Sequence, residues 1–228
     1  MNAPPGTTSL LLADDHAIVR QGLLALLGIE PRFRIVGEAR NGREAVQLAH
    51  ALRPDVILMD IAMPELNGLD ATRQILDADP AARVVILSAY SEFAYIERMI
   101  GAGAVGYLEK QSSAEVVIKA IGEVAQGRTY LSPSVRKRLQ HLRNSHDRHG
   151  LLKYQSQRLT ARESEVLQLV AEGRANKQIA ALLTISIKTV EKHRQCLMNK
   201  LDIHDTASLT RHAISIGMVN AGPGPAPA

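Results

Sequence analysis

A regular alternation of short apolar runs and helical patterns fills the first 128 of the 228 residues, and it constrains the fold more than any other feature. Continuous apolar runs are typical of strands buried on both faces, and apolar residues three and four apart are typical of helices. Five such runs, at residues 9–13, 33–38, 55–59, 83–88 and 103–110, are each followed by a helical segment. Because strand–helix–strand units join parallel strands by right-handed crossovers, this order predicts a doubly wound, five-stranded α/β sheet.

Polar side chains stand where four of these strands end. Asp14 and Asp15 follow the first strand, Asp60 the third, Ser88 closes the fourth and Lys110 the fifth. The carboxyl ends of parallel strands meet at one edge of a sheet, so these side chains are expected to converge there. Three carboxylates in one place need a cation, and hard oxygen ligands suit Mg²⁺. The set predicts that Asp60 attacks a phosphoryl group, with Lys110 and Ser88 binding the phosphoryl oxygens.

The charge of the chain is divided between its two parts. Residues 1–128 carry 12 basic and 16 acidic side chains, a net charge of −4, and residues 129–228 carry 15 and 7, a net charge of +8. A basic second part favours a polyanionic partner. No apolar run reaches the ~20 residues of a membrane span, and no secretory signal is recognisable, so a cytoplasmic protein without a membrane partner is expected.

The basic part contains the pattern of a helix-turn-helix. Thr160 and Glu163 form a capping-box sequence before an apolar helical segment, and residues 176–183 predict a short helix. Ser186 is a good N-cap for a longer helix over residues 187–201, which has basic residues opposite an apolar face. A short helix, a tight turn and a longer basic helix are typical of a unit that places its second helix in the major groove of DNA. Cys196 on this helix is read as a packed small residue in preference to a redox sensor.

Residues 9–126 resemble a response-regulator receiver domain. The resemblance rests on four segments: residues 13–16 (Ala-Asp-Asp-His), residues 59–64 with Gly68, residues 86–89 (Ile-Leu-Ser-Ala) and residues 106–110 (Gly-Tyr-Leu-Glu-Lys). It implies strand order 2-1-3-4-5 and phosphorylation of one aspartate by a sensor histidine kinase. The residues it assigns are Asp60 as acceptor, Asp14, Asp15, Asp60 and the Ala62 carbonyl as Mg²⁺ ligands, Lys110 and Ser88 as phosphoryl-binding groups, and Tyr107 as a switch.

Residues 159–219 resemble the LuxR-type helix-turn-helix that closes response regulators of the nitrate-regulator and nitrogen-fixation-regulator type. The match includes residues 159–167, 176–180 and 185–193. It implies a four-helix DNA-binding domain for double-stranded DNA, with contacts from Lys188, Thr189, Lys192, His193 and Arg194. Two positions depart from the pattern: Ala175 replaces a Ser or Thr cap, and Asp202 replaces the usual Gly after the recognition helix.

These readings divide the chain into a leader (1–8), a receiver domain (9–128), a linker (129–157), a DNA-binding domain (158–219) and a disordered tail (220–228). A short helix is expected within the linker at residues 133–142. The linker also holds His141, His146 and His149, which favour a solvated segment over a metal site because no cysteine or carboxylate pattern accompanies them.

The resulting hypothesis is a transcriptional regulator switched by phosphorylation of Asp60. It would form a homodimer on phosphorylation or on DNA, and RNA polymerase is a further candidate partner. One alternative is a DNA-binding regulator whose receiver-like domain is controlled without phosphorylation. Another is a Mg²⁺-dependent phosphohydrolase with an aspartyl nucleophile, but Ala62 stands where such enzymes carry a second carboxylate, so no enzyme is expected.

Overall fold

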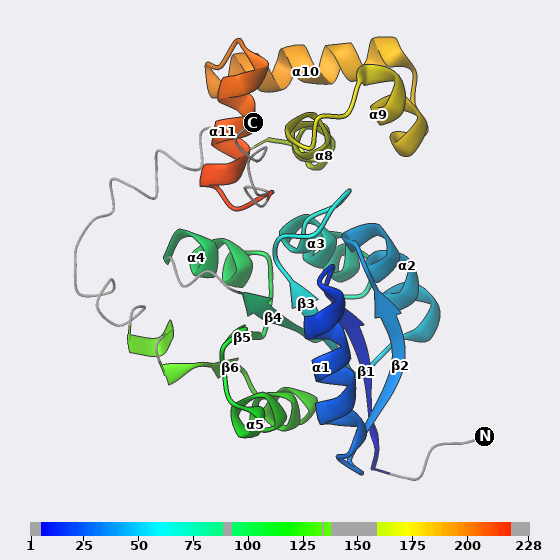
Figure 1. Cartoon of the computed structure of the whole chain (residues 1–228), viewed down its shortest axis with the longest axis vertical. Coiled ribbons are helices and arrows are strands. Elements are labelled where there is room, and N and C mark those ends of the chain that lie inside the picture. Colours follow the sequence, from blue (N-terminus) through cyan, green and yellow to red (C-terminus); the bar gives the residue numbers. More distant parts are fainter. Residues whose placement is uncertain (1–5, 89–92, 134, 138–158, 220–228) are drawn as a thin grey trace, which may run out of the picture. The chain divides into compact units, whose positions relative to one another are not determined.

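The structure is a computed structural model of the whole chain, and it describes residues 6–88, 93–133, 135–137 and 159–219. The chain divides into two compact units, residues 1–143 and 144–228, each described by itself. Figure 1 shows the strands and covering helices of the first unit and the helices of the second. No helix in the described part of the chain is long and apolar enough to cross a membrane.

The N-terminal unit is a parallel sheet with strand order β2-β1-β3-β4-β5-β6 and every neighbouring pair parallel. Its strands are β1 (Thr8–Ala13), β2 (Phe33–Ala39), β3 (Val56–Asp60), β4 (Val84–Ser88), β5 (Gly106–Glu109) and β6 (Tyr130–Leu131). Between them run α1 (Ala17–Gly28), α2 (Gly42–Leu52), α3 (Gly68–Ala78), α4 (Phe93–Gly101) and α5 (Ala114–Ala125). The predicted doubly wound architecture and the order of its five strands are confirmed.

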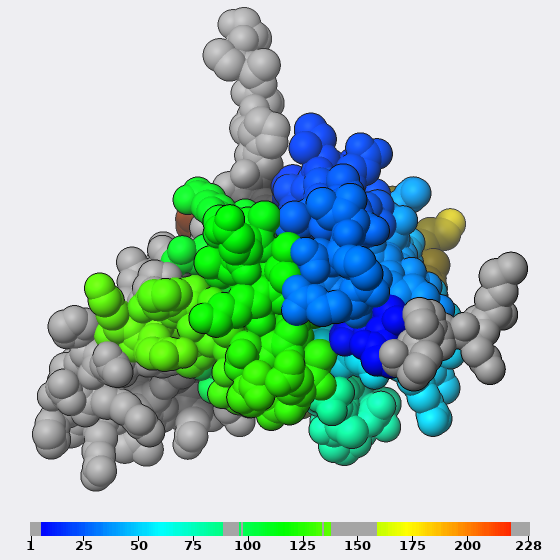
Figure 2. All heavy atoms as spheres, turned by 90° about the horizontal axis from the view of Figure 1, so that it is seen from below, coloured from blue at the N-terminus to red at the C-terminus, as the bar shows by residue number. Residues whose placement is uncertain are grey.

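Side chains of alternate residues in the central strands pack into two separate hydrophobic cores, one on each face of the sheet. Leu11, Ile57 and Ile86 pack with α2, α3 and α4 on one face of the sheet. Leu10 and Leu58, one residue away, pack with α1 and α5 on the other face. In Figure 2, atoms of α1 and α5 lie side by side over that second face. Because both faces are covered, the strands read as unbroken apolar runs in the sequence.

The sixth strand corrects the prediction of five. Tyr130 and Leu131 pair with Gly106 and Tyr107 of β5, at residues assigned to the start of the linker. Val135 follows and is buried in the core that also contains Tyr107. A two-residue strand is too short to show a periodicity, so no sequence pattern predicts it.

Other predictions fall on residues that the structure does not describe. The helix expected at residues 133–142 is helical at Pro133 and at residues 135–137, and its remainder lies outside the described residues. So do His141, His146 and His149, the first residues of the leader, and the tail from residue 220.

The C-terminal unit has the four helices that the sequence predicts. They are α8 (Ala161–Ala171), α9 (Asn176–Leu183), α10 (Ile187–Leu201) and α11 (Thr206–Ser215). Their apolar faces meet in one core that includes Val166, Leu169, Ile179, Val190, Leu197 and Leu209. Cys196 is half-buried, consistent with a packed residue.

Caps fix where these helices begin. Thr160 and Glu163 form the predicted capping box at α8, and the Ser186 hydroxyl accepts a hydrogen bond from Thr189 N at α10. At α9 the box is half made: Gln178 Oε1 accepts from Ala175 N, but the Ala175 side chain has no acceptor to return the bond. Asp202 ends α10 with a left-handed φ of 53°, the backbone conformation that glycine adopts most easily.

Candidate functional site

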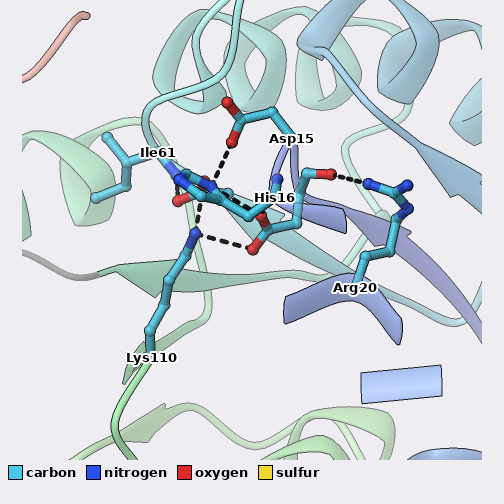
Figure 3. Close-up of polar contacts among 7 residues, drawn as sticks. Asp15, His16, Arg20, Ile61 and Lys110 are labelled. Carbon is cyan, nitrogen blue, oxygen red and sulfur yellow. Dashed lines mark hydrogen bonds and ion pairs between the residues drawn. The ribbon is translucent and has the colours of Figure 1, made fainter. Parts of the chain in front are cut away.

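The polar side chains at the strand ends converge in the N-terminal unit. Asp14 follows β1, Asp60 closes β3 and Lys110 follows β5. The Lys110 ammonium lies between the two carboxylates, 2.7 Å from Asp60 Oδ2 and 2.9 Å from Asp14 Oδ2. Figure 3 shows Lys110 reaching toward this group from its own strand. Residues 14, 60 and 110, far apart in the sequence, thus share one site, as parallel topology requires.

Burial governs the ionisation of this site. The side chains of Asp14 and Asp60 are almost fully buried. Burial raises the pKa of Asp60 to about 7; Lys110 opposes this rise, and the carboxylates of Asp14 and Asp15 add to it. Burial alone would lower the pKa of Lys110, but the Asp60 and Asp14 charges more than offset it, and the net change is upward. With Asp14, Asp15 and Asp60 ionised, their three negative charges exceed the single positive charge of Lys110 by two, which one divalent cation would balance.

The backbone around Asp60 is held by a close approach of two segments. Asp60 Oδ1 accepts a hydrogen bond from Ile61 N at 2.8 Å, and Gly68 N donates to the Ile61 carbonyl at 2.7 Å. A Cβ at position 68 would lie 2.0 Å from the Asp60 carbonyl oxygen. Only glycine allows this contact, so Gly68 fixes the start of α3 against the end of β3. Ala62 is buried in the loop between them.

Two buried residues stand beside the site on β4 and β5. Ser88 ends β4 and is fully buried, and Tyr107 of β5 is 1% exposed. Tyr107 lies in the same buried core as Ile96 and Met99 of α4 and Val135 beyond β6. Ala89, which follows Ser88, lies outside the described residues.

In the C-terminal unit, α10 presents a polar face. Val190 and Leu197 are buried in the core, while Lys188 and Lys192 are exposed. The tip of the helix is ordered by the Ser186 cap, and the Thr189 hydroxyl lies 2.8 Å from the Ser186 hydroxyl. A capped helix with exposed lysines in its first turns can place those turns in a DNA groove.

Arg194, predicted to contact DNA, is engaged within its own unit. Its guanidinium donates to Asn176 Oδ1 at 2.8 Å and to Thr206 Oγ1 at 3.2 Å. These bonds tie the beginnings of α9 and α11 to the middle of α10. The guanidinium therefore helps to set the angle at which the recognition helix stands. Thr189 and His193 are half-buried.

Comparison with known proteins covers both units. Residues 10–122 match the response regulator receiver domain, and residues 157–213 match the bacterial regulatory proteins of the luxR family. The chain is 35% identical over 222 residues to the transcriptional regulatory protein DegU of Brevibacillus brevis, covering 92% of this chain and 94% of the other. It is 39% identical over 212 residues to the transcriptional regulatory protein LiaR of Bacillus subtilis, with coverage of 92% and 99%.

The chain belongs to the two-component response regulators with a LuxR-type DNA-binding domain.

Solved structures agree with this assignment. A LuxR-family two-component response regulator from Aurantimonas is 34% identical with a TM-score of 0.58, covering 60% of this chain and 98% of that one. A complex of the response regulator RcsB with DNA is 25% identical with a TM-score of 0.55, covering 92% and 98%. The family consists of transcriptional regulators, so the chain is a phosphorylation-switched DNA-binding regulator and the phosphohydrolase alternative falls away.

The donor set of the receiver domain fits the Mg²⁺ ion that the family implies. Ligand atoms of Asp14, Asp15, His16 and Asp60 all lie within 4.8 Å of one another. Asp14 Oδ2 and Asp15 Oδ1 are buried, and the nitrogens that contact them are Lys110 Nζ at 2.9 Å and His16 Nδ1 at 2.7 Å. Carboxylate oxygens are the ligands that a hard divalent cation prefers.

Arg20 is a residue of the receiver site that sequence reasoning missed. It is 8% exposed, and its guanidinium donates to the Asp14 carbonyl at 2.8 Å and to Glu38 Oε2 at 3.1 Å. Figure 3 shows Arg20 and Lys110 on opposite sides of the group of side chains. Nothing in its helical position marked it, because an arginine in α1 reads as part of a solvated face.

On α10 sequence reasoning also passed over Glu191 and Gln195. Both are exposed, and their positions in the helix place them on the side that carries Lys188 and Lys192. The sequence prediction considered mainly the basic residues of this helix and therefore omitted them. The helical period of 3.6 residues already places both on the same side as the two lysines.

Proposed function

We propose that Asp60 is the phosphoacceptor of this regulator. The observation that carries the proposal is the Lys110 ammonium held between Asp60 and Asp14, with the Asp15 carboxylate in the same cluster. Structural ion pairs are normally neutral overall, whereas this one leaves negative charge in excess at the end of a buried strand. That excess is useful where a cation and a phosphoryl group are to be received together.

The phosphoryl group would come from a phosphohistidine of a sensor histidine kinase. An Asp60 carboxylate oxygen attacks phosphorus, the new O–P bond forms as the N–P bond breaks, and the imidazole nitrogen keeps the electron pair. Asp14, Asp15, Asp60 and the Ala62 carbonyl would hold a Mg²⁺ ion, whose charge would offset that of the phosphoryl oxygens. Lys110 then pairs with one of those oxygens.

Ser88 and Tyr107 would report the new state. The Ser88 hydroxyl lies on β4 next to β3 and would donate to a phosphoryl oxygen of phosphorylated Asp60. Tyr107 is one strand further along, packed against α4 and Val135. A shift of Ser88 changes the space beside Tyr107 and hence the surface formed by α4 and β5.

The output would be binding of double-stranded DNA by α10. Lys188 and Lys192 are exposed and contact phosphates or bases; Thr189 and His193 lie nearer the base edges. Arg194, the last predicted contact, acts mainly by orienting α10. A homodimer formed on phosphorylation would present two recognition helices to half-sites roughly 10 base pairs apart. A cytoplasmic location and contact with RNA polymerase accompany this role.

Intact-mass spectrometry tests the acceptor. Full-length protein is treated with acetyl phosphate and Mg²⁺, and we expect the mass of one phosphoryl group on wild type and none on Asp60→Asn. Asp77→Asn, an exposed carboxylate on α3, is the matched control and should be modified like wild type. An unmodified wild type would favour control without phosphorylation, and a modified Asp60→Asn would refute the assignment of Asp60.

A further inference from the structure

The exposed face of α10 carries one acidic residue among basic ones. Successive residues of a helix are ~100° apart, so positions 188, 191, 192 and 195 share one side. All four side chains are exposed, whereas Val190 and Leu197 on the opposite side are buried. The exposed part of the face that we propose to meet DNA therefore consists of Lys188, Glu191, Lys192 and Gln195.

No contact in the described part of the chain explains the presence of Glu191 on this face. Within the described residues its carboxylate forms no ion pair and accepts no hydrogen bond, even though Lys188 stands one turn before it. It is the fifth residue of α10, beyond the first turn in which a carboxylate gains from the helix dipole. On a helix that approaches a polyanion, its charge lowers affinity for phosphates. A side chain that costs affinity there is explained if it contributes selectivity.

The chemistry of a carboxylate selects one base. An ionised carboxylate only accepts hydrogen bonds. In the major groove guanine offers two acceptors and thymine offers an acceptor and a methyl group, so neither suits it. Adenine offers an amino donor beside the N7 acceptor, which repels a carboxylate and suits an amide. Cytosine offers its N4 amino group without that acceptor.

We propose that Glu191 is a specificity-determining residue that accepts a hydrogen bond from cytosine N4 in the major groove. Lys188 and Lys192 flank it and offset its charge against the phosphates. The proposal rests on the proposed binding of DNA by α10. It adds that the protein prefers cytosine at one position of each half-site. It assigns affinity to the lysines and base choice to the carboxylate.

The first experiment is selection from a randomised duplex pool with the full-length, acetyl-phosphate-treated protein, followed by affinity measurements on the selected duplex. We expect one cytosine in each half-site that wild type requires. Replacing it with a cytosine analogue that lacks the 4-amino group should weaken wild type about tenfold, the scale of one specific base contact. Glu191→Ala should bind both duplexes equally, and Glu191→Gln should move the preference toward adenine.

The control is Asp202→Asn, which removes one negative charge at the other end of α10. Asp202 is 94% exposed and has a left-handed φ, which asparagine also adopts. It should tighten binding slightly on every sequence and keep the cytosine preference. If Glu191→Ala behaves in the same way, the carboxylate acts only through its charge and the proposal is wrong. A wild type that selects no sequence at all would instead refute DNA binding by α10, and this proposal with it.

Discussion

Asp60 lies where its own neutral form is favoured. Its pKa is raised from its ordinary value of 3.8 to about 7, chiefly by burial. Between these two values the folded protein holds a proton that the unfolded chain has released. The free energy of unfolding therefore falls as pH rises through this window. The buried carboxylates that would bind a divalent cation therefore lower the free energy of unfolding when no cation is bound.

Asp60→Asn removes this titration. In Mg²⁺-free buffer we expect the variant to be more stable than wild type above pH 7 by on the order of 2 kcal/mol, with the difference shrinking toward pH 4. This is about half of the stability change that the whole pKa shift of Asp60 corresponds to, because Lys110 loses one carboxylate partner in the variant. Urea unfolding at several pH values measures it, with Asp77→Asn as control. A difference that is constant between pH 4 and pH 8 would contradict the raised pKa.

For single residues, the sequence predicts the charged groups of the site better than the residues that hold those groups in place. Asp14, Asp60 and Lys110 could be named because strand ends of a parallel sheet must meet. Arg20 could not be named, because its hydrogen bond to the Asp14 carbonyl depends on the conformation of a long side chain, which hydrophobic periodicity does not predict. Arg194 was assigned to DNA for its charge, yet its guanidinium bonds to Asn176 and Thr206.

At the scale of elements, the junction of β3 and α3 depends on Gly68. Gly68→Ala would place a methyl group 2.0 Å from the Asp60 carbonyl oxygen, so we expect a loss of roughly 2–3 kcal/mol in the free energy of unfolding. Gly122→Ala is the matched control, since no atom lies within 4 Å of the added carbon in α5. It should stabilise by about 0.5–1 kcal/mol. Urea titration of both variants checks the pair; equal effects would mean that the loop simply moves aside.

The beginning of α9 offers a gain. Ala175→Ser supplies the side-chain acceptor that the half-made capping box lacks, and we expect the helix to gain about 1 kcal/mol. Ala181→Ser, exposed within the same helix, should be neutral or slightly destabilising. Amide hydrogen exchange at α9 separates the two. Slower exchange in both variants, or in neither, would contradict the role given to the cap.

Element types followed from the sequence wherever a period was long enough to repeat. The apolar strands, the amphipathic helices and the caps at Thr160 and Ser186 were all readable. The two residues of β6 were not, because their pairing with β5 depends on where α5 returns the chain. The same limit hid the burial of Val135 against Tyr107.

At the scale of the whole molecule, the division of charge reflects two kinds of partner. The acidic part contains the proposed phosphoacceptor site and the basic part contains α10. The sequence could identify both parts because each carries its own motif. We propose that the state of Asp60 sets the affinity of α10 for DNA, and a comparison of the phosphorylated and unphosphorylated chain tests this.

The most direct test of the central claim is the affinity of the full chain for its selected duplex, measured by fluorescence anisotropy at fixed salt with and without acetyl phosphate and Mg²⁺. We predict that phosphorylation tightens binding by wild type about tenfold or more, the usual scale of a coupling free energy between sites. Asp60→Asn should show no change, and Asp77→Asn should follow wild type. Equal affinity of wild type in both states, with phosphorylation confirmed by mass, would contradict the claim that Asp60 controls DNA binding.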